Sequence, residues 1–307
     1  MLQAIQQIAA IILVMLVGFL AAKGKHKIIT PTVRAGLTGL VINIAMPAVI
    51  VRSGNLAISG AAWWQALYVF VFGLVFHFGC FFVIRPLAAR FYPTLHEGKA
   101  ATVCITFNNC VFVGFPILSA LHGDQGVFYG SIFAVTYYLG LYTIGTALLQ
   151  GDKKVSIKEQ LLTPFNFALL LMFVLLLTPF KLPAIVNSAV DLMANLCTPL
   201  SLLVIGAMVA EMNLKAVLSD RNVYITMAMR LLVIPLLTLL ILVFIPWSAE
   251  LRQALLALSA MPTAAIVPMM AQEHKCAPQF TSAVTVQTTL FFPLTFSIIL
   301  WLGNLLI

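Results

Sequence analysis

Long apolar runs recur along the whole chain, and they constrain its fold more than any other feature of the sequence. A helix that spans a bilayer needs about 20 mostly apolar residues. Charged residues make up only 8% of the chain, against roughly 25% in soluble domains. This composition excludes a water-soluble enzyme, a disordered chain and a nucleic-acid-binding module, and it predicts an all-α integral membrane protein. The ten predicted spans are 5–22, 31–51, 62–84, 99–120, 126–149, 163–180, 184–209, 222–245, 251–271 and 279–304.

The positive charges favour one orientation in the membrane. The net charge is +8, but the 17 Lys and Arg residues are scattered between apolar runs, which argues against nucleic acid as a partner. If the N-terminus is outside, 13 of them fall on the inner side, 3 on the outer side and Arg230 within a span. Because positively charged loops stay on the cytoplasmic side, we expect a multi-pass protein of the cell (inner) membrane with both termini outside. Arg52, at the outer end of the second span, is interpreted as an interface anchor.

A shift of 152 residues superimposes unusual positions of the two halves. Pro31 falls on Pro183, Pro116 on Pro268, and Asn43-Ile44-Ala45-Met46-Pro47 on Asn195-Leu196-Cys197-Thr198-Pro199. This match predicts an internal duplication, with a first repeat of residues 1–150 and a second of residues 151–307. Five spans in each repeat would make the second repeat enter the membrane from the opposite side. Such inverted repeats are typical of secondary transporters, whose binding site lies near the midplane.

Two spans contain residues that interrupt a helix near its middle. They are Gly114, Phe115 and Pro116 in span four, and Pro262, Thr263, Val267 and Pro268 in span nine. Proline cannot donate a backbone hydrogen bond, and it clashes with the preceding turn. One interpretation is a pair of kinks whose freed carbonyls are satisfied by neighbouring helices. The matched positions in the two repeats favour the other, in which both helices break and cross at their prolines.

Broken helices would create a binding site for an anion. The second half of each helix would begin near the midplane with unpaired N–H groups and a partial positive charge, which attract a carboxylate. Asn108 and Asn109 precede the first break and can add hydrogen bonds; the alternative is that they only join helices. We therefore assign the residues of both breaks and the two asparagines to substrate binding, together with the repeat-related pair Asn43 and Asn195.

Three ionisable residues lie at depth within the spans, where charge is costly and often functional. Asp191 in span seven could carry a coupling proton or bind a cation. Arg230 in span eight could pair with a substrate carboxylate, or with Asp191 as a structural ion pair. His77 in span three could titrate near neutral pH, or it could be a satisfied polar residue in a helix interface.

These segments resemble one known family. The stretch Asn109-Cys110-Val111-Phe112-Val113-Gly114-Phe115-Pro116-Ile117-Leu118 is similar to the fourth-helix motif of the auxin efflux carrier family, Asn-Thr-Leu-x-x-Gly-x-Pro-Leu-Leu. The stretch from Pro262 to Glu273 resembles the ninth helix of that family, and Asn43-x-x-x-Pro47 its second. The resemblance covers the whole chain, but Cys110 stands where plant members have Thr.

The resemblance implies a fold and a substrate class. It implies two inverted five-helix repeats, a scaffold of helices 1, 2, 6 and 7 through which members often form homodimers, and a mobile transport part of helices 3–5 and 8–10. The implied substrates are organic anions: plant members export indole-acetate, and bacterial members are linked to malate and malonate. Only residues 151–160 separate the two halves, which fits a bacterial-type member.

The sequence therefore predicts a secondary transporter that carries small organic anions by alternating access, without a cofactor or a metal. An anion channel, or a carrier of a different small solute, is the alternative. The chain contains no glycine-rich phosphate loop, no His-Glu-x-x-His and no Gly-x-Ser-x-Gly, so we expect neither an ATP-driven pump nor an enzyme.

Overall fold

The computed structural model describes residues 2–24, 27–54, 60–150, 164–178, 180–210 and 220–307. Within these ranges the chain is helical, and its only extended pairing is one isolated β-bridge. Among the described residues, six helices are long and apolar enough to cross a membrane, namely Pro31–Arg52, Trp63–Phe91, Gly114–Gln150, Ala184–Met208, Arg221–Val243 and Pro278–Leu306. Of the other predicted spans, the first and sixth correspond to shorter apolar helices, and the fourth and ninth are interrupted. Several residues of the charge argument, Lys25, Lys153, Lys154, Lys158 and Lys215, lie outside the described residues, as does the start of the predicted second repeat.

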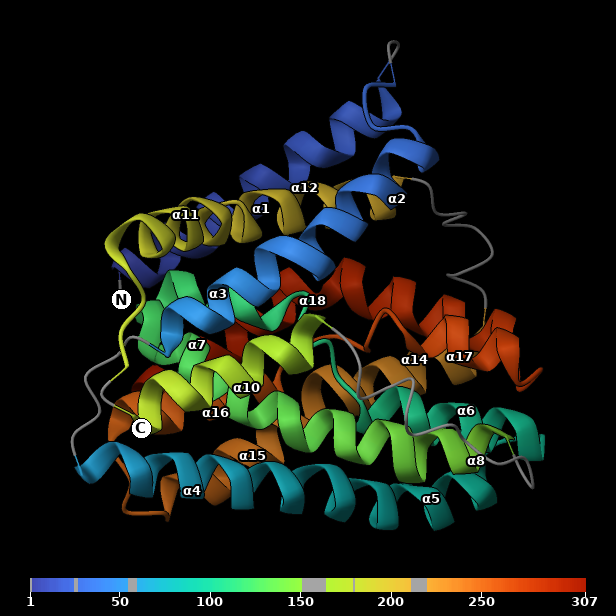
Figure 1. Cartoon of the computed structure of the whole chain (residues 1–307). Helices are drawn as coiled ribbons and strands as arrows, with labels where there is room; N and C mark the ends of the chain where they lie inside the picture. The colour runs from blue at the N-terminus through green and yellow to red at the C-terminus, as the bar shows by residue number, and fades with distance from the viewer. Residues whose placement is uncertain (1, 25–26, 55–59, 151–163, 179, 211–219) are drawn as a thin grey trace. The chain divides into compact units, whose positions relative to one another are not determined.

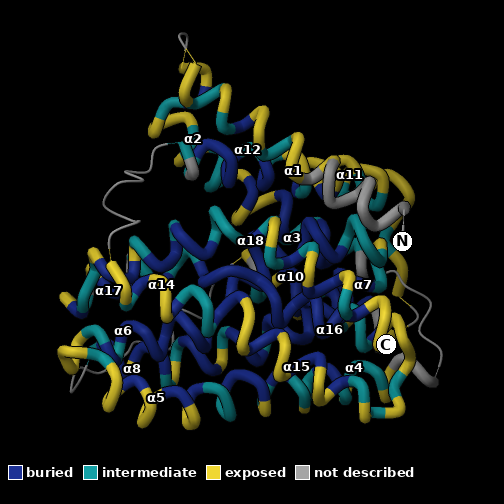
Figure 2. The backbone as a smooth tube through the Cα atoms, turned by 180° about the vertical axis from the view of Figure 1, so that it is seen from behind, coloured by how far each residue is buried: buried dark blue, intermediate teal, exposed yellow. Residues whose placement is uncertain are grey.

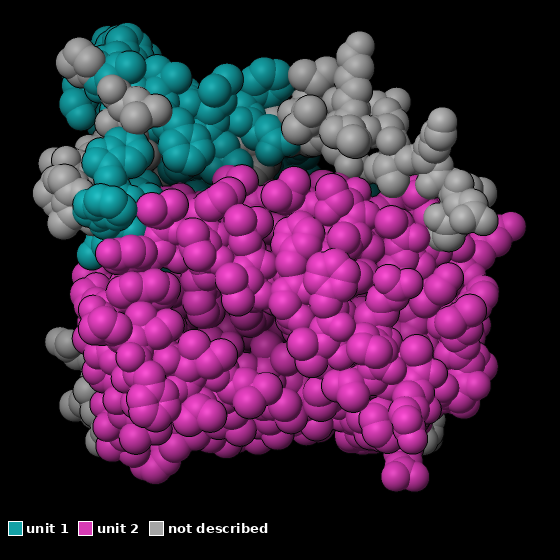
Figure 3. Space-filling model, turned by 90° about the horizontal axis from the view of Figure 1, so that it is seen from below, with its two compact units in different colours: residues 1–66, 111–131, 156–212 teal, residues 67–110, 132–155, 213–307 magenta. Residues whose placement is uncertain are grey.

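The chain divides into two compact units, coloured separately in Figure 3. Unit 1 comprises residues 1–66, 111–131 and 156–212, and unit 2 comprises residues 67–110, 132–155 and 213–307. Each unit draws on both halves of the sequence, so neither unit coincides with one of the predicted repeats.

Unit 1 contains a close pairing of α1 (Leu2–Lys23) with α12 (Cys197–Ala210), which run side by side in Figure 1. Glycines make this approach feasible. A Cβ atom added at Gly18 would lie 2.2 Å from the carbonyl oxygen of Leu203, and one added at Gly206 would lie 1.8 Å from that of Met15. Any larger residue would therefore push the two backbones apart.

The second predicted span also belongs to unit 1 and forms one distorted helix. It begins with α2 (Pro31–Leu40), which is capped by the Thr30 hydroxyl, continues through the π-helical turn η1 (Val41–Ala45), and ends with α3 (Met46–Ser53). Proline at the first helical position is favoured because its missing N–H would have no partner there. α3 packs against α10 (Pro164–Leu177) and α11 (Ala184–Asn195).

Unit 2 gathers its helices around α18 (Pro278–Leu306). The elements that contact α18 include α6 (Leu95–Thr106), α14 (Arg221–Ala228), α16 (Ala249–Ser259) and α17 (Val267–Glu273). A long helix made of α4 (Gly60–Leu74), η2 (Val75–Gly79) and α5 (Cys80–Phe91) runs from unit 1 into unit 2, where α5 packs on α6. A second distorted helix consists of α14, η4 (Met229–Val233) and α15 (Ile234–Val243).

Burial separates interior helices from peripheral ones (Figure 2). Every residue from 100 to 113 and from 254 to 264 is buried, so the ends of α6 and α16 are enclosed on all sides. In contrast, Ile185 and Leu192 of α11 and Phe244, which follows α15, expose most of their apolar surface. Such exposure is costly in water but is expected in a bilayer.

A turn separates the fourth predicted span from the fifth. α7 (Gly114–Gly140) contains Gly123 at φ 58°, which divides it into two helices. Only glycine adopts this left-handed backbone conformation without strain. The fifth span then continues through η3 (Leu141–Gly145) and α8 (Thr146–Gln150).

Candidate functional site

Two non-helical segments meet in unit 2, between the end of α6 and the start of α7 and between the end of α16 and the start of α17. Asn108 and Thr263 form an antiparallel bridge there. The Asn109 N–H donates to the Pro262 carbonyl at 2.7 Å, and the Ala264 N–H donates to the Phe107 carbonyl at 3.0 Å. A backbone that leaves the helix in a membrane must find other partners. Here the two segments supply partners for each other, and we call this contact the crossing.

Side chains of the crossing cap the helices in a reciprocal way. The Asn108 amide nitrogen donates to the Leu258 carbonyl of α16 at 2.6 Å, and the Thr263 hydroxyl donates to the Cys104 carbonyl of α6 at 3.0 Å. The last carbonyls of a helix lack partners within the helix. Each segment therefore satisfies a carbonyl of the other segment's helix, which gives Asn108 and Thr263 structural roles.

Arg230 lies beside the crossing in η4 and is fully buried. Its Nε donates to the Met261 carbonyl at 3.0 Å and its Nη1 to the Ile105 carbonyl at 2.8 Å. Its Nη2 donates to the Ser259 carbonyl. The described residues offer Arg230 no acidic partner.

Asn109 differs from its neighbour. It is only 8% exposed, and its backbone is engaged in the crossing, but its side-chain amide has no hydrogen-bond partner among the described residues. A ligand or water can supply the missing partner of such an amide. Asn109 therefore has its whole side-chain amide available, whereas Asn108 uses its amide nitrogen and leaves only its buried side-chain oxygen without a partner among the described residues.

His77 is packed behind the crossing. Its Nδ1 lies 2.8 Å from the Gly73 carbonyl oxygen, and its ring stacks on Phe107 with centroids 6.0 Å apart and an interplanar angle of 10°. Phe133 lies closer still, at 4.7 Å between centroids. Its Nε2 is also buried but has no hydrogen-bond partner among the described residues, so only one of the two ring nitrogens is satisfied.

Pro116 and Pro268, the two repeat-related prolines of the broken spans, do not lie at the crossing itself. Pro116 is the third residue of α7, and Pro268 is the second residue of α17, which Val267 begins. In the first turn a missing N–H costs little, so both prolines mark where a helix restarts. Of the predicted prolines, only Pro262 takes part in the crossing. Gly114 and the buried Phe115 open α7 and belong, with Pro116, to unit 1.

The other predicted residues of unit 1 have separate environments. Asn43 is exposed in η1 and donates to the Gly39 carbonyl of its own helix at 2.9 Å. Asp191 is half-buried in α11, and its carboxylate has no ion pair or hydrogen bond among the described residues. Asn195 ends α11 and is held by Arg52.

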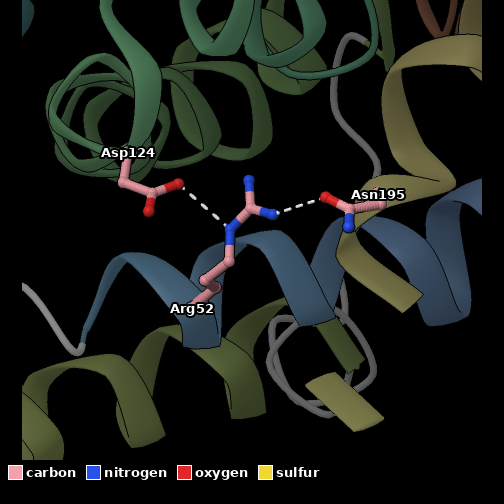
Figure 4. A network of polar contacts seen from close by, with 3 residues as sticks. All are labelled: Arg52, Asp124 and Asn195. Atoms are coloured by element: carbon pink, nitrogen blue, oxygen red, sulfur yellow. Dashed lines mark hydrogen bonds and ion pairs between the residues drawn. The ribbon is translucent and has the colours of Figure 1, made fainter. Parts of the chain in front are cut away.

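Arg52 forms a polar network that sequence reasoning missed (Figure 4). Its Nε lies 3.0 Å from a carboxylate oxygen of Asp124, and its Nη1 donates to the Asn195 side-chain oxygen at 2.9 Å. Arg52 is thus an ion-pair partner within unit 1. Opposite charges near the ends of neighbouring spans, at 52 and 124, were the available signal.

The long apolar helices and the crossing of two interrupted segments within a buried core define a multi-pass membrane protein. The family model described as "Membrane transport protein" matches residues 3–301, nearly the whole chain. The chain therefore belongs to this family, that of the auxin efflux carriers, whose members are transporters. A comparison with curated proteins finds no match.

Proposed function

We propose that this protein is a secondary transporter that carries small organic anions across the cell membrane by alternating access. The observation that carries the proposal is the side-chain amide of Asn109, an 8% exposed residue at the crossing of two interrupted helices, which has no hydrogen-bond partner among the described residues. An amide N–H is a suitable donor to a carboxylate, and transporters place their substrates at such discontinuous helices.

Charge supports an anion rather than a cation as the substrate. The segments 107–113 and 260–266 contain no acidic residue that could hold a cation. α17 has only seven residues, so its dipole adds little, and the proposal does not depend on it.

Matched distortions support the inverted five-helix repeats. The 152-residue shift moves the interruption 107–113 to 259–265, and the second interruption spans 260–266. It moves η2 to 227–231, which overlaps η4, and η1 to 193–197, where α11 gives way to α12. We therefore propose ten spans, a scaffold of spans 1, 2, 6 and 7 that forms a homodimer, and a moving part of spans 3–5 and 8–10, as in a bacterial-type member of the inner membrane.

Asp191 and His77 are the candidates for coupling. The half-buried carboxylate of Asp191 has the better access to a proton or a cation, because His77 is enclosed by aromatic rings. An Asp191→Asn protein that keeps the pH and sodium dependence of the wild type would show Asp191 to be a packing residue.

The test is electrical. Purified protein in liposomes is adsorbed on a solid-supported membrane, and mono- and dicarboxylates are applied at several pH values beside empty liposomes. We expect a saturable current for at least one acid. Asn109→Ala should raise its half-saturating concentration about 10- to 100-fold, the value of one hydrogen bond to a charged group. Asn304→Ala, an exposed asparagine near the end of α18, is the matched control and should behave as wild type.

Radiolabelled counterflow separates a carrier from an anion channel. A carrier accelerates uptake when the same acid is present inside, whereas a channel does not. Silence in both the current and the radiolabelled uptake assays, across the panel, would overturn the organic-acid assignment and favour a different small solute.

A further inference from the structure

Three backbone carbonyls, at or just beyond the ends of two different helices, converge on one side chain. Ile105 lies in the last turn of α6, Ser259 is the last residue of α16, and Met261 follows two residues later in the crossing. All three carbonyls accept from Arg230, which uses Nη1, Nη2 and Nε in turn. Arg230 itself comes from a third element, η4, at least 29 residues away in sequence.

The ends of α6 and α16 carry a combined negative charge. The C-terminus of a helix is equivalent to roughly half a negative charge, so two ends that meet at the crossing amount to about one. Both ends are enclosed by protein, where water is not available to screen them. One guanidinium supplies about the charge needed for neutrality, and its planar fork of donors can serve several acceptors at once.

The environment of Arg230 leaves little room for a substrate contact. The side chain is fully buried, its three nitrogens all donate to carbonyls, and its guanidinium carbon lies 5.8 Å from the centre of the Phe76 ring. A ligand carboxylate would have to displace hydrogen bonds that hold both helices.

We propose that Arg230 is a positioning residue, a shared C-cap that neutralises both interrupted helices and holds the two segments of the crossing in register. By holding Pro262 opposite Asn109, it fixes the position of the Asn109 amide. Only this last consequence rests on the proposed function; the cap itself does not depend on any substrate.

Hydrogen–deuterium exchange on the purified full-length protein, without ligand, tests the proposal. The amides of Asn109 and Ala264 donate across the crossing, so peptides that cover 105–113 and 258–266 report its opening. We expect Arg230→Met to speed exchange in both peptides by about tenfold or more, since hydrogen bonds to a charged group are lost. Arg230→Lys keeps the positive charge but loses the planar set of guanidinium donors. We expect it to raise the exchange rate by less than Arg230→Met does, in at least one of the two peptides.

Arg252→Met is the matched control. Arg252, near the start of α16, also donates to backbone carbonyls, those of Leu242 and Ile307 at 3.5 and 3.1 Å, but neither acceptor belongs to the crossing segments. It should leave both peptides unchanged. If the Arg230→Met protein does not fold, the exchange rates of the Arg230→Lys protein test the proposal instead.

Exchange at wild-type rates in both peptides of a folded Arg230 variant, or an increase matched by Arg252→Met, would overturn the shared cap. If Arg230 instead contacted the substrate, its replacement would leave exchange in both peptides unchanged when no ligand is present. Failure of the transport assay leaves this result intact, because the exchange measurement uses no substrate.

Discussion

Asn108 and Thr263 show at the residue scale why polar side chains occur in an otherwise apolar segment. Each caps a carbonyl at the end of the opposite interrupted helix, and both are fully buried. Asn109, one position further on, has its backbone in the same bridge but leaves its amide available. Two adjacent asparagines thus have different roles, one structural and one proposed for the substrate.

We expect Thr263→Val to destabilise the protein although it preserves the shape of the side chain. The change leaves the Cys104 carbonyl without its buried donor, which costs about 1–3 kcal/mol, or a fall of roughly 2–6 °C in the apparent Tm. Thermal unfolding followed by intrinsic fluorescence measures it.

Thr143→Val is the isosteric control for this change. Thr143 is exposed and bonds the Leu139 carbonyl of its own helix, so its replacement should shift the Tm by less than about 1 °C. Equal shifts for the two variants would refute the capping role of Thr263.

At the scale of elements, the pairing of α1 with α12 depends on the absence of side chains. Lipid does not drive helices together as water does. Helices in a membrane therefore associate through close packing, which small residues allow. The backbone approach at Gly18 and Gly206 leaves no space for a Cβ atom.

Gly206→Ala should therefore separate the two helices. Overpacking of this kind typically costs 1–3 kcal/mol or more, and we expect an apparent Tm at least roughly 3 °C below wild type. Gly36→Ala in α2 is the control, because a Cβ atom there meets nothing within 4 Å and alanine favours a helix. A Gly206→Ala protein as stable as Gly36→Ala would contradict the close approach.

At the scale of the whole molecule, the unequal distribution of Lys and Arg predicts the orientation. With 13 of 17 on one side of ten spans, that side should be cytoplasmic. Alkaline phosphatase fused after Ile307 should be active and green fluorescent protein at the same position dark, because the first folds only outside and the second only inside.

The same two reporters inserted within residues 151–163 should give the opposite result. If green fluorescent protein fused after Ile307 were fluorescent, either the proposed orientation would be reversed or the number of spans would differ from ten by one.

Hydropathy and the positions of proline and glycine are local features of the sequence. They were sufficient to predict an all-α membrane protein with interruptions in spans four and nine. The family resemblance, seen in the motif 109–118, is confirmed by the match over residues 3–301. Local properties could not predict which atoms satisfy the freed carbonyls. The prolines were expected at the crossing, but Pro116 and Pro268 restart helices, since the first turn is where a missing N–H costs least.

The roles of Arg230 and Arg52 depend on contacts between distant parts of the chain. Arg230 donates to Ile105 across 125 residues, and Arg52 to Asn195 across 143. From the sequence, a buried arginine is equally compatible with a substrate, an acidic partner or a helix end, because all three offer oxygen acceptors. Only folding brings one of these acceptors within 3 Å, and for Arg230 the acceptors are the unsatisfied carbonyls that the broken helices themselves create.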